Sequence, residues 1–431
     1  MGVSCGSLRN VASLAERTPI DASGGAGSGT ADSALGVLRR LALPVYLPIT
    51  ASTLGVGVLV PVLPLYLTES GLSIAFTSLV LAAVGAGAFI GGLPAGAVIA
   101  RVGSQRILDW SLAVLALSTM LLGATTFALA LVVLRMAAGA ANVSIRLSRQ
   151  TYITRRVSRQ VRGRSMALIG GAFRLSMFVG PLLGGVLADT IGFAWTFLVA
   201  GLLSGVGLVP ALLSRRDPLP ALDGRERPAR PAPLIASLRR HLRLLLTAGV
   251  VPLLVMTARE GRYVVLPLIG DDLGLSAAGV GAVVAIGTAA DLLLFPVAGW
   301  IMDRWGRLAA MIPAFGLIAV GLLLLGVADS TSAVIVAGVV MGVGNGLSAG
   351  TMLTLGSDLA PADATSQFLA GIAVMQDIGR ITGPLVVGLV GAWLGLGAAS
   401  IALACVLGLA VLWLLTVIGE TSRRPATARL S

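Results

Sequence analysis

The sequence predicts an all-α integral membrane protein in which twelve transmembrane helices form two pseudo-symmetric six-helix bundles. Three observations support this fold class: an apolar composition, twelve apolar runs long enough to cross a bilayer, and a repeat that relates the two halves of the chain. Of the 431 residues, 56% are hydrophobic and 12% are charged, whereas a soluble domain carries about 25% charged residues. Lipid is therefore the expected solvent for most of the chain.

Each apolar run has about 20 or more residues, enough to span the hydrocarbon core of a bilayer as a helix. The expected helices of the first half are 41–66, 74–99, 107–126, 128–150, 165–189 and 194–213. Those of the second half are 244–270, 277–301, 309–327, 332–356, 366–391 and 397–418. The predicted bundles are accordingly residues 40–213 and 244–418.

The remaining segments are polar. Residues 1–39 are rich in Gly, Ser and Ala and lack the apolar core of a signal peptide, so we expect a disordered cytoplasmic tail. Residues 214–243 combine prolines with arginines, which suits a linker over the membrane surface. Residues 419–431 form the expected C-terminal tail.

The two halves of the chain align at a constant offset of 203 residues, with no gap over a long stretch. The offset matches Arg101 with Arg304 and Asn142 with Asn345. It also aligns short motifs: Leu63-Pro64-Leu65 with Leu266-Pro267-Leu268, Gly71-Leu72-Ser73 with Gly274-Leu275-Ser276, and Gly180-Pro181-Leu182 with Gly383-Pro384-Leu385. Since each half has six helices, the repeat is parallel, with its pseudo-two-fold axis along the membrane normal.

Arginines occupy alternate loops and predict the orientation. One set of loops and the C-terminal tail carry Arg101, Arg106, Arg155, Arg156, Arg159, Arg162, Arg164, Arg304, Arg307, Arg423, Arg424 and Arg429. The opposite loops carry Glu69, Asp189, Asp271, Asp272 and Asp329. The positive-inside rule therefore places both termini and the linker in the cytoplasm.

Several function classes are disfavoured. The net charge of +12 does not indicate nucleic-acid binding, because all 31 basic residues are arginines and most lie in these loops. Cys5 and Cys405 are too far from other ligands to predict a disulfide framework or a thiolate metal site. The lone His241 lies in the linker. We therefore expect no catalytic residue, no metal site and no cofactor.

A glycine turn with a charged pair follows the helix predicted at 277–301. Gly299, Asp303, Arg304, Gly306 and Arg307 have the spacing G-x-x-x-D-R-x-G-R. This segment resembles the loop that members of the major facilitator superfamily carry between helices 2 and 3, and often between helices 8 and 9. The resemblance implies a role in gating.

The first half holds a second copy of this loop, with Gly96, Arg101, Gly103 and Arg106, but Ala100 stands where the family has the aspartate. This departure puts in doubt the charge-based stabilisation of the family's outward-facing state on that side. Ordinary positive-inside arginines are the alternative interpretation of both copies.

Two further segments resemble the drug–proton antiporter branch of this superfamily. The helix predicted at 165–189 carries a glycine and Gly-Pro motif, with Gly171, Gly180, Pro181, Gly184 and Gly185. Generic tight helix packing is the alternative explanation of this motif. The segment from Arg135 to Gly139 resembles the family's arginine motif, which implies a role for Arg135 in proton coupling.

Ionisable residues within the membrane are costly and are candidates for function. They lie only on helices that, in this family, can face a central cavity: Arg135, Arg174, Arg259, Glu260, Arg262, Asp291, Asp377 and Arg380. Five arginines thus accompany three acids, so the substrate could be anionic or zwitterionic, or one acid could be free to bind a cation. The candidate substrate-cavity residues are Arg135, Asn142, Arg174, Arg259, Arg262, Asn345 and Arg380.

Proton coupling needs a carboxylate whose arginine contacts change during transport, since desolvation raises a carboxyl pKa and a nearby arginine lowers it. The candidates are Asp377, Glu260 and Asp291, and the first two rank highest because each has an arginine at helical or adjacent spacing. Static ion pairs are the alternative. Because the repeat aligns Arg174 with Asp377, we also expect these two side chains to approach each other, or to share substrate, across the cavity.

The resemblance implies a secondary transporter rather than an enzyme. We expect proton-coupled multidrug efflux of small amphipathic molecules, with the proton gradient as the energy source. The chain is expected to act as a monomer among the lipids of a bacterial inner (plasma) membrane. Proton-linked or facilitative uptake of a small polar or anionic metabolite is the first alternative. A membrane sensor or scaffold that transports nothing is the second.

Overall fold

The computed structural model describes residues 41–157, 159–213 and 241–421. In these residues, twelve helical spans are long and apolar enough to cross a membrane, which confirms the predicted number. Most of the predicted N-terminal tail, linker and C-terminal tail lies outside the described residues, including Arg423, Arg424 and Arg429.

The first six spans are η2 with α2 (Ala42–Tyr46 and Leu47–Glu69), α3 (Ile74–Val102), α4 (Ser104–Leu122), α5 (Ala128–Arg156), α6 (Arg159–Ile191), and α7 with α8 (Phe193–Val206 and Leu208–Leu213). The second six are α10 (Leu242–Asp272), α11 (Ala277–Trp305), α12 (Arg307–Gly326), α13 with α14 (Thr331–Leu347 and Thr351–Leu359), α15 (Thr365–Leu394), and α16 with η3 (Leu396–Trp413 and Leu414–Ile418). The predicted boundaries therefore lie within a few residues of the observed ones, except that α5 ends later and α6 begins earlier than predicted.

The helix ends repeat with the predicted offset. Ser73 and Ser276 each accept a hydrogen bond from the backbone N–H three residues later, at 3.3 Å, and so cap α3 and α11. Gly103 and Gly306 both have φ near +100°, which lets the chain turn sharply into α4 and α12. Identical caps and turns at corresponding positions confirm the internal repeat.

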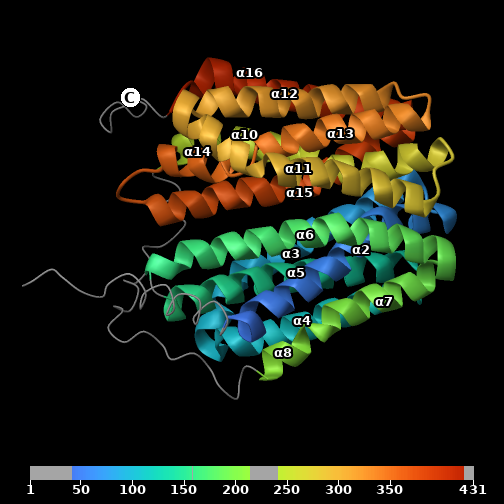
Figure 1. The fold of residues 1–431 in the computed structure, drawn as a ribbon, viewed down its shortest axis with the longest axis horizontal. Coiled ribbons are helices and arrows are strands. Elements are labelled where there is room, and N and C mark those ends of the chain that lie inside the picture. Colours follow the sequence, from blue (N-terminus) through green and yellow to red (C-terminus); the bar gives the residue numbers. More distant parts are fainter. Residues whose placement is uncertain (1–40, 158, 214–240, 422–431) are drawn as a thin grey trace, which may run out of the picture.

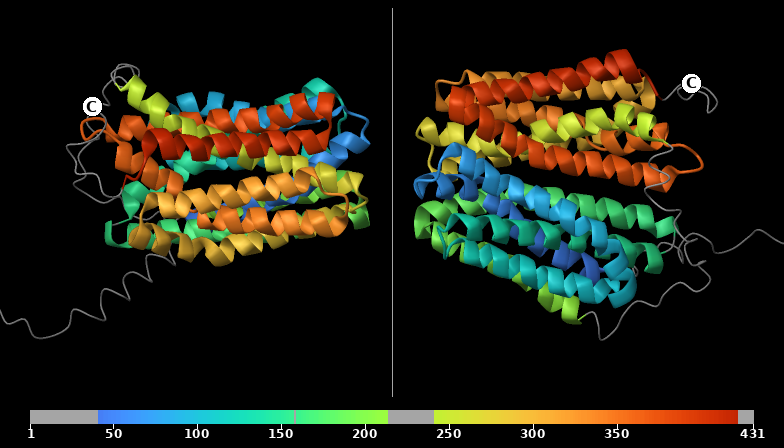
Figure 2. Two further views of the ribbon diagram at one scale, coloured as in Figure 1. Left: turned by 90° about the horizontal axis from the view of Figure 1, so that it is seen from above. Right: turned by 180° about the vertical axis from the view of Figure 1, so that it is seen from behind.

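The two bundles lie side by side, as the blue-to-green and yellow-to-red helices of Figure 1 show. They meet mainly along two seams, α3 with α15 and α6 with α11, and α2 adds smaller contacts with α10 and α11. Helices α4, α7, α12 and α16 pack on their own bundle, and the other views also place α12 and α16 on the outside (Figure 2). The charged helices therefore surround the interface, as expected.

Within each bundle, glycines allow helix backbones to touch. A Cβ atom built on Gly139 would lie 2.0 Å from the carbonyl oxygen of Val84, and one on Gly342 would lie 2.1 Å from that of Gly287. These two contacts are related by the 203-residue offset. They bring α5 against α3 and α13 against α11, in the manner of small-residue packing in membranes.

The Gly-Pro motif of α6 faces two neighbours. Cβ atoms on Gly180 and Gly184 would clash with the backbone of α2, whereas one on Gly185 would lie 2.2 Å from the carbonyl oxygen of Ala277 in the other bundle. Gly171 lies in open space and lines a recess near one end of the bundle. The motif thus makes close packing possible both within a bundle and between bundles, and nothing in this geometry requires antiport.

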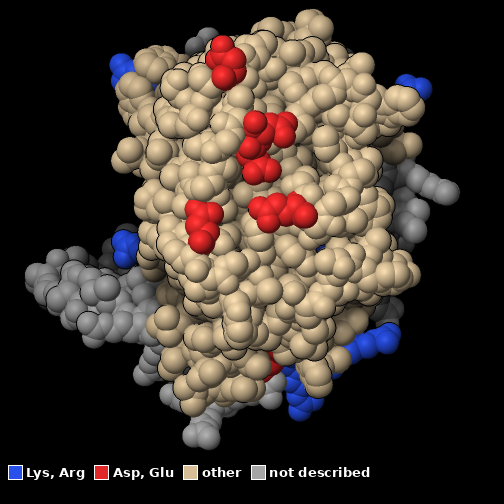
Figure 3. Space-filling view, turned by 90° about the vertical axis from the view of Figure 1, so that its right-hand side faces the viewer, with Lys and Arg blue, Asp and Glu red and all other residues tan. Residues whose placement is uncertain are grey.

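The two ends of the molecule differ in charge. Glu69, Asp189, Asp271, Asp272 and Asp329 are exposed at one end, here called the acidic end, where Figure 3 shows acidic side chains across the face and basic ones at its margin. The opposite end, with the loops that follow α3, α5 and α11, is called the basic end. This separation is the one that the loop sequences predict.

At the basic end, the loop after α11 is held by carboxylates of its own bundle. Arg307 Nε lies 3.0 Å from Asp358 Oδ2, and Asp303 lies 3.7 Å from Arg307. Glu420 accepts hydrogen bonds from the backbone N–H groups of Arg307 and Leu308, at 2.9 and 3.0 Å, and caps α12. The corresponding loop after α3 has Ala100 in place of Asp303 and cannot make the same carboxylate contact.

At the acidic end, Asp189 closes the seam between α6 and α11. Its two carboxylate oxygens accept hydrogen bonds from the backbone N–H groups of Ala277 and Ala278, at 3.1 and 2.9 Å. These groups lie in the first turn of α11, where N–H groups have no acceptor within the helix and a negative charge is stabilised. Asp189 therefore joins the two bundles at this end.

Gly184→Ala should destabilise the protein, because the new methyl group would lie 2.3 Å from the carbonyl oxygen of Val58. Overpacking of this kind costs about 1–3 kcal/mol, so the melting temperature of the purified protein should fall. Gly408→Ala is the matched control, since its methyl group would enter open space. Equal melting temperatures for the two variants would show that α6 can move away from α2 at little cost.

Asp189→Ala should favour separation of the bundles at the acidic end. The probe is Ser78→Cys, fully buried on the α3–α15 seam, in a background in which Cys5 and Cys405 are serine. Loss of a helix cap costs about 0.5–2 kcal/mol, so the cysteine should react with a thiol reagent in detergent about 2- to 30-fold faster. Asp329→Ala, in the loop between α12 and α13, should leave the rate unchanged; an unchanged rate in Asp189→Ala would mean that Asp189 does not hold the seam.

Candidate functional site

Charged side chains gather midway along the spans in two groups. The first group crosses the bundle interface. Arg174 of α6 lies 3.8 Å from Asp291 Oδ1 of α11, measured from its Nε atom, and its guanidinium lies 4.0 Å from the centre of the Phe295 ring. The other Asp291 oxygen accepts a hydrogen bond of 2.7 Å from the Asn345 side chain of α13. Three helices from both bundles thus meet at one carboxylate.

The second group belongs to the C-terminal bundle. Arg380 of α15 bonds Asp377 on the same helix, and its Nε lies 3.6 Å from Glu260 Oε1 of α10. From the N-terminal bundle, Arg135 interacts electrostatically with Glu260, and Arg146 with Asp377 and Arg380. One arginine therefore serves two acids, with further positive charge across the interface.

Arg259 of α10 lies beside a break in the tenth span. It donates a hydrogen bond to the hydroxyl of Ser348, which follows the last residue of α13. The chain then turns at Gly350, whose φ of +77° is left-handed, and α14 begins. The corresponding helix of the first half, α5, is continuous, because Leu147 stands at the position equivalent to Gly350.

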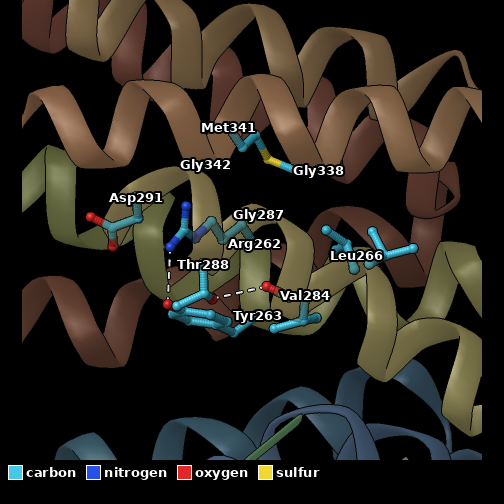
Figure 4. A pocket seen from close by; sticks show the side chains of 11 residues that line it. Arg262, Tyr263, Leu266, Val284, Gly287, Thr288, Asp291, Gly338, Met341 and Gly342 are labelled. Atoms are coloured by element: carbon cyan, nitrogen blue, oxygen red, sulfur yellow. Dashed lines mark hydrogen bonds between the residues drawn. The ribbon is translucent and has the colours of Figure 1, made fainter. Parts of the chain in front are cut away.

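Arg262 lies in a separate small pocket between α10, α11 and α13 (Figure 4). Its guanidinium donates to the Tyr263 hydroxyl at 2.9 Å and also lies over the Tyr263 ring, 4.7 Å from the centre. The pocket has about 30 Å³ of space, enough for a water molecule but not for an organic substrate. Arg262 therefore lies beside the site and is not in a position to contact an organic substrate in this pocket.

A larger cavity of about 360 Å³ lies next to the first group. This volume falls within the range of about 300–1,000 Å³ typical of small-molecule sites. Its polar lining consists of Arg174, Arg259, Asn345, Ser348 and Gln376. Its apolar lining comes mainly from α14 and α15: Ala349, Met352, Leu353, Leu369, Ile372 and Ala373.

Of the predicted cavity residues, Arg174, Arg259 and Asn345 line this cavity, and Arg262 lines the small pocket. Arg135, Asn142 and Arg380 line neither. Arg174 and Asp377, which were expected to approach each other, pair with other residues instead: Arg174 with Asp291 and Asp377 with Arg380. The repeat places equivalent backbones symmetrically, but each side chain takes the partner that its own neighbours offer.

Sequence reasoning missed Ser348, Gly350 and Gln376. A signal for the first two was present: Gly346, Ser348 and Gly350 stand where the first half has Val143, Ile145 and Leu147. Glycine and serine in place of larger apolar residues weaken a helix, and this difference between the halves indicates the break between α13 and α14. Gln376 had no such signal, since only the packing of α15 turns it toward the cavity.

A family model described as Major Facilitator Superfamily matches residues 46–258 and 251–430. The MFS-type transporter olcL of Penicillium canescens is 31% identical over 103 residues, which are 24% of this chain and 18% of that protein. An uncharacterised MFS-type transporter of Methanocaldococcus jannaschii is 19% identical over 366 residues, which cover 84% of this chain and 94% of that protein.

Among solved structures, a POT family transporter in complex with 5-aminolevulinic acid superposes with a TM-score of 0.71. The match covers 88% of this chain and 95% of that chain at 14% identity. An identity this low supports the similarity of fold and nothing finer.

Arg380→Gln should destabilise the protein, because it leaves both Glu260 and Asp377 without their bonded arginine. Breaking a fully buried ion pair costs about 3–5 kcal/mol. Because the Arg380 side chain keeps 27% of its surface exposed, we expect less, about 2 kcal/mol, seen as a lower melting temperature. The triple variant that adds Glu260→Gln and Asp377→Asn should recover much of the loss; a further loss would show that the acids are not balanced by Arg380.

Proposed function

The chain belongs to the major facilitator superfamily, and on this basis we propose that it exports small amphipathic molecules in exchange for protons by alternating access. That it is a transporter follows from its family. The direction, the coupling ion and the class of substrate are the proposal. The observation that carries the proposal is the ion pair between Arg174 and Asp291, which crosses the bundle interface beside the cavity.

The proposed orientation places the basic end and both termini in the cytoplasm, by the positive-inside rule. The membrane would be a bacterial inner membrane, and the protein would act as a monomer, since each chain holds both bundles and the site between them. In this orientation the closed seam at the acidic end faces outward. The cavity then belongs to the inward-facing state, in which an exporter takes up its substrate.

Asp291 is the first candidate for the coupling carboxylate. Rocking of one bundle against the other must change its distance from Arg174, because the two residues belong to different bundles. A carboxylate that loses an arginine neighbour binds a proton more readily, and one that regains it releases the proton. Alternating access could thereby drive protonation and deprotonation of Asp291 on opposite sides of the membrane.

Rocking of the bundles should change the ion pairs of Asp377 and Glu260 less than the pair of Asp291 with Arg174. Asp377 and Arg380 lie on the same helix, and Glu260 and Arg380 lie within one bundle, so rigid rocking leaves both pairs intact. Glu260 still has Arg135 across the interface at longer range. We therefore rank Asp291 before Glu260 and Asp377, and we regard the last two primarily as a static ion network.

Uptake of an anionic metabolite is the second candidate function. The excess of arginines over acids around the cavity favours it, because such a site attracts anions whichever way they move. The Gly-Pro motif of α6 resembles exporters of the family and supports the first candidate.

The test is transport in inside-out vesicles with an acidic lumen, using a panel of fluorescent amphiphiles. The wild-type protein should accumulate at least one dye, and collapse of the pH gradient should abolish accumulation. Asp291→Asn keeps a partner for Asn345 but cannot carry a proton. It should lose gradient-driven accumulation while still exchanging labelled for unlabelled substrate.

Asp329→Asn, at the acidic end, is the matched control and should behave as wild type. Accumulation that persists in Asp291→Asn would remove Asp291 from the mechanism, and Glu260→Gln and Asp377→Asn would then be compared in the same assay. If no dye responds to the gradient, proton-coupled export of amphiphiles is wrong, and accumulation of a metabolite in right-side-out vesicles would support uptake.

A further inference from the structure

The charges around the cavity do not balance. The three acids of the two groups are shared by Arg174 and Arg380. In the described part of the chain, the ion pairs include neither Arg135, Arg259 nor Arg262. Of the two arginines that line the larger cavity, Arg174 and Arg259, only Arg174 therefore has a carboxylate within 4.0 Å.

Arg259 cannot relieve this imbalance by itself. A desolvated carboxylate can take up a proton and become neutral, but an arginine keeps its charge at any physiological pH. Its Nε is buried without a hydrogen-bond partner in the described structure, and its bond to Ser348 brings a hydroxyl dipole rather than a negative charge. Asp291 and Glu260 interact with it electrostatically, but both carboxylates are already paired, with Arg174 and Arg380. An anion in the cavity would supply the missing charge.

The break in the tenth span provides a second feature that favours an anion. The wall of the cavity includes Gly350, Met352 and Leu353, the residues at which α14 begins. N–H groups in the first turn of a helix lack acceptors within the helix, and the helix dipole favours negative charge there. Arg259 and the first residues of α14 line the same cavity, where the N–H group of Thr351 already donates to the carbonyl oxygen of Ser348.

The opposite wall is apolar. Leu369, Ile372 and Ala373 of α15 line the cavity together with Met352 and Leu353. A simple inorganic anion would leave these side chains against water. A substrate with a negative head and an apolar body would instead cover both walls.

We propose that the cavity binds small organic monocarboxylates, with the carboxylate against Arg259 and the N-terminus of α14 and the apolar body against Leu369 and Ile372. The inference rests on the proposed function only in taking this cavity as the transport site. It names the substrate class and leaves open the direction of transport and the coupling ion.

Equilibrium binding to the purified protein in lipid nanodiscs, without a gradient, tests the substrate class. The probes are arylalkyl carboxylates of graded length, such as 4-phenylbutyrate, each beside the amide and the amine with the same carbon skeleton, and inorganic phosphate. We expect the carboxylates to bind at least about tenfold more tightly than the matched amides, as a charge-assisted pair implies, and neither amines nor phosphate to compete.

Variants locate the carboxylate. Arg259→Gln should weaken carboxylate binding about tenfold or more and leave the weak binding of the amides unchanged. Arg259→Lys keeps the charge but not the two parallel donors, and should fall between. Arg243→Gln makes the same charge change on an exposed turn of α10 and should match wild type.

Several results would overturn the proposal: amines or amides that bind as well as the carboxylates, phosphate that competes, absence of binding by every carboxylate, or carboxylate affinity that is unchanged in Arg259→Gln. Binding of the carboxylate, amide, amine and phosphate probes to the wild-type protein tests the substrate class even if the variants fail to fold. Binding is measured without a gradient, so carboxylate binding together with failed gradient-driven transport would refute proton coupling alone. Gradient-driven movement of cationic dyes with no carboxylate binding would refute the substrate class alone.

Discussion

A charge in the membrane interior needs a counter-charge, because water is not there to solvate it, and this constraint organises the molecule. The intramembrane charges lie on helices that meet at or near the bundle interface, where carboxylates and arginines can find each other. The outer helices α4, α7, α12 and α16 pack apolar side chains against their own bundle. The site is thus the part of the structure in which charges can be tolerated.

The two halves share their packing and differ in their chemistry. Glycine contacts, serine caps and glycine turns recur at the 203-residue offset, because both bundles must bring backbones equally close. The charged residues of the site do not recur in this way: Arg174 corresponds to the oppositely charged Asp377. Asp291 corresponds to Ala88, Arg259 to Val56, and Arg380 to Met177. A symmetric scaffold therefore holds an asymmetric site, most of which belongs to the C-terminal bundle.

The two ends of the molecule are also unequal. At the acidic end Asp189 caps a helix of the opposite bundle, whereas its counterpart by the repeat is Ala392, which has no carboxylate to make this contact at the α3–α15 seam. At the basic end the loop after α3 lacks the aspartate that its counterpart, Asp303, provides. The described contacts thus favour closure at the acidic end over closure at the basic end, which bears on the equilibrium between the two states of a rocking transporter.

The sequence by itself determined the twelve spans, the repeat, the separation of basic and acidic loops and the set of intramembrane charges. Each of these follows from local composition and spacing, since a bilayer accepts only apolar helices of a certain length. The tertiary structure decided which charges pair. Arg174 and Asp377 occupy equivalent positions, but Arg174 turns to Asp291 and Asp377 to Arg380. It also decided that Arg259, beside the broken helix at Gly350, has no carboxylate within 4.0 Å among the residues that the structure describes. Side-chain partners depend on distances between helices that are far apart in sequence, and no local pattern carries that information.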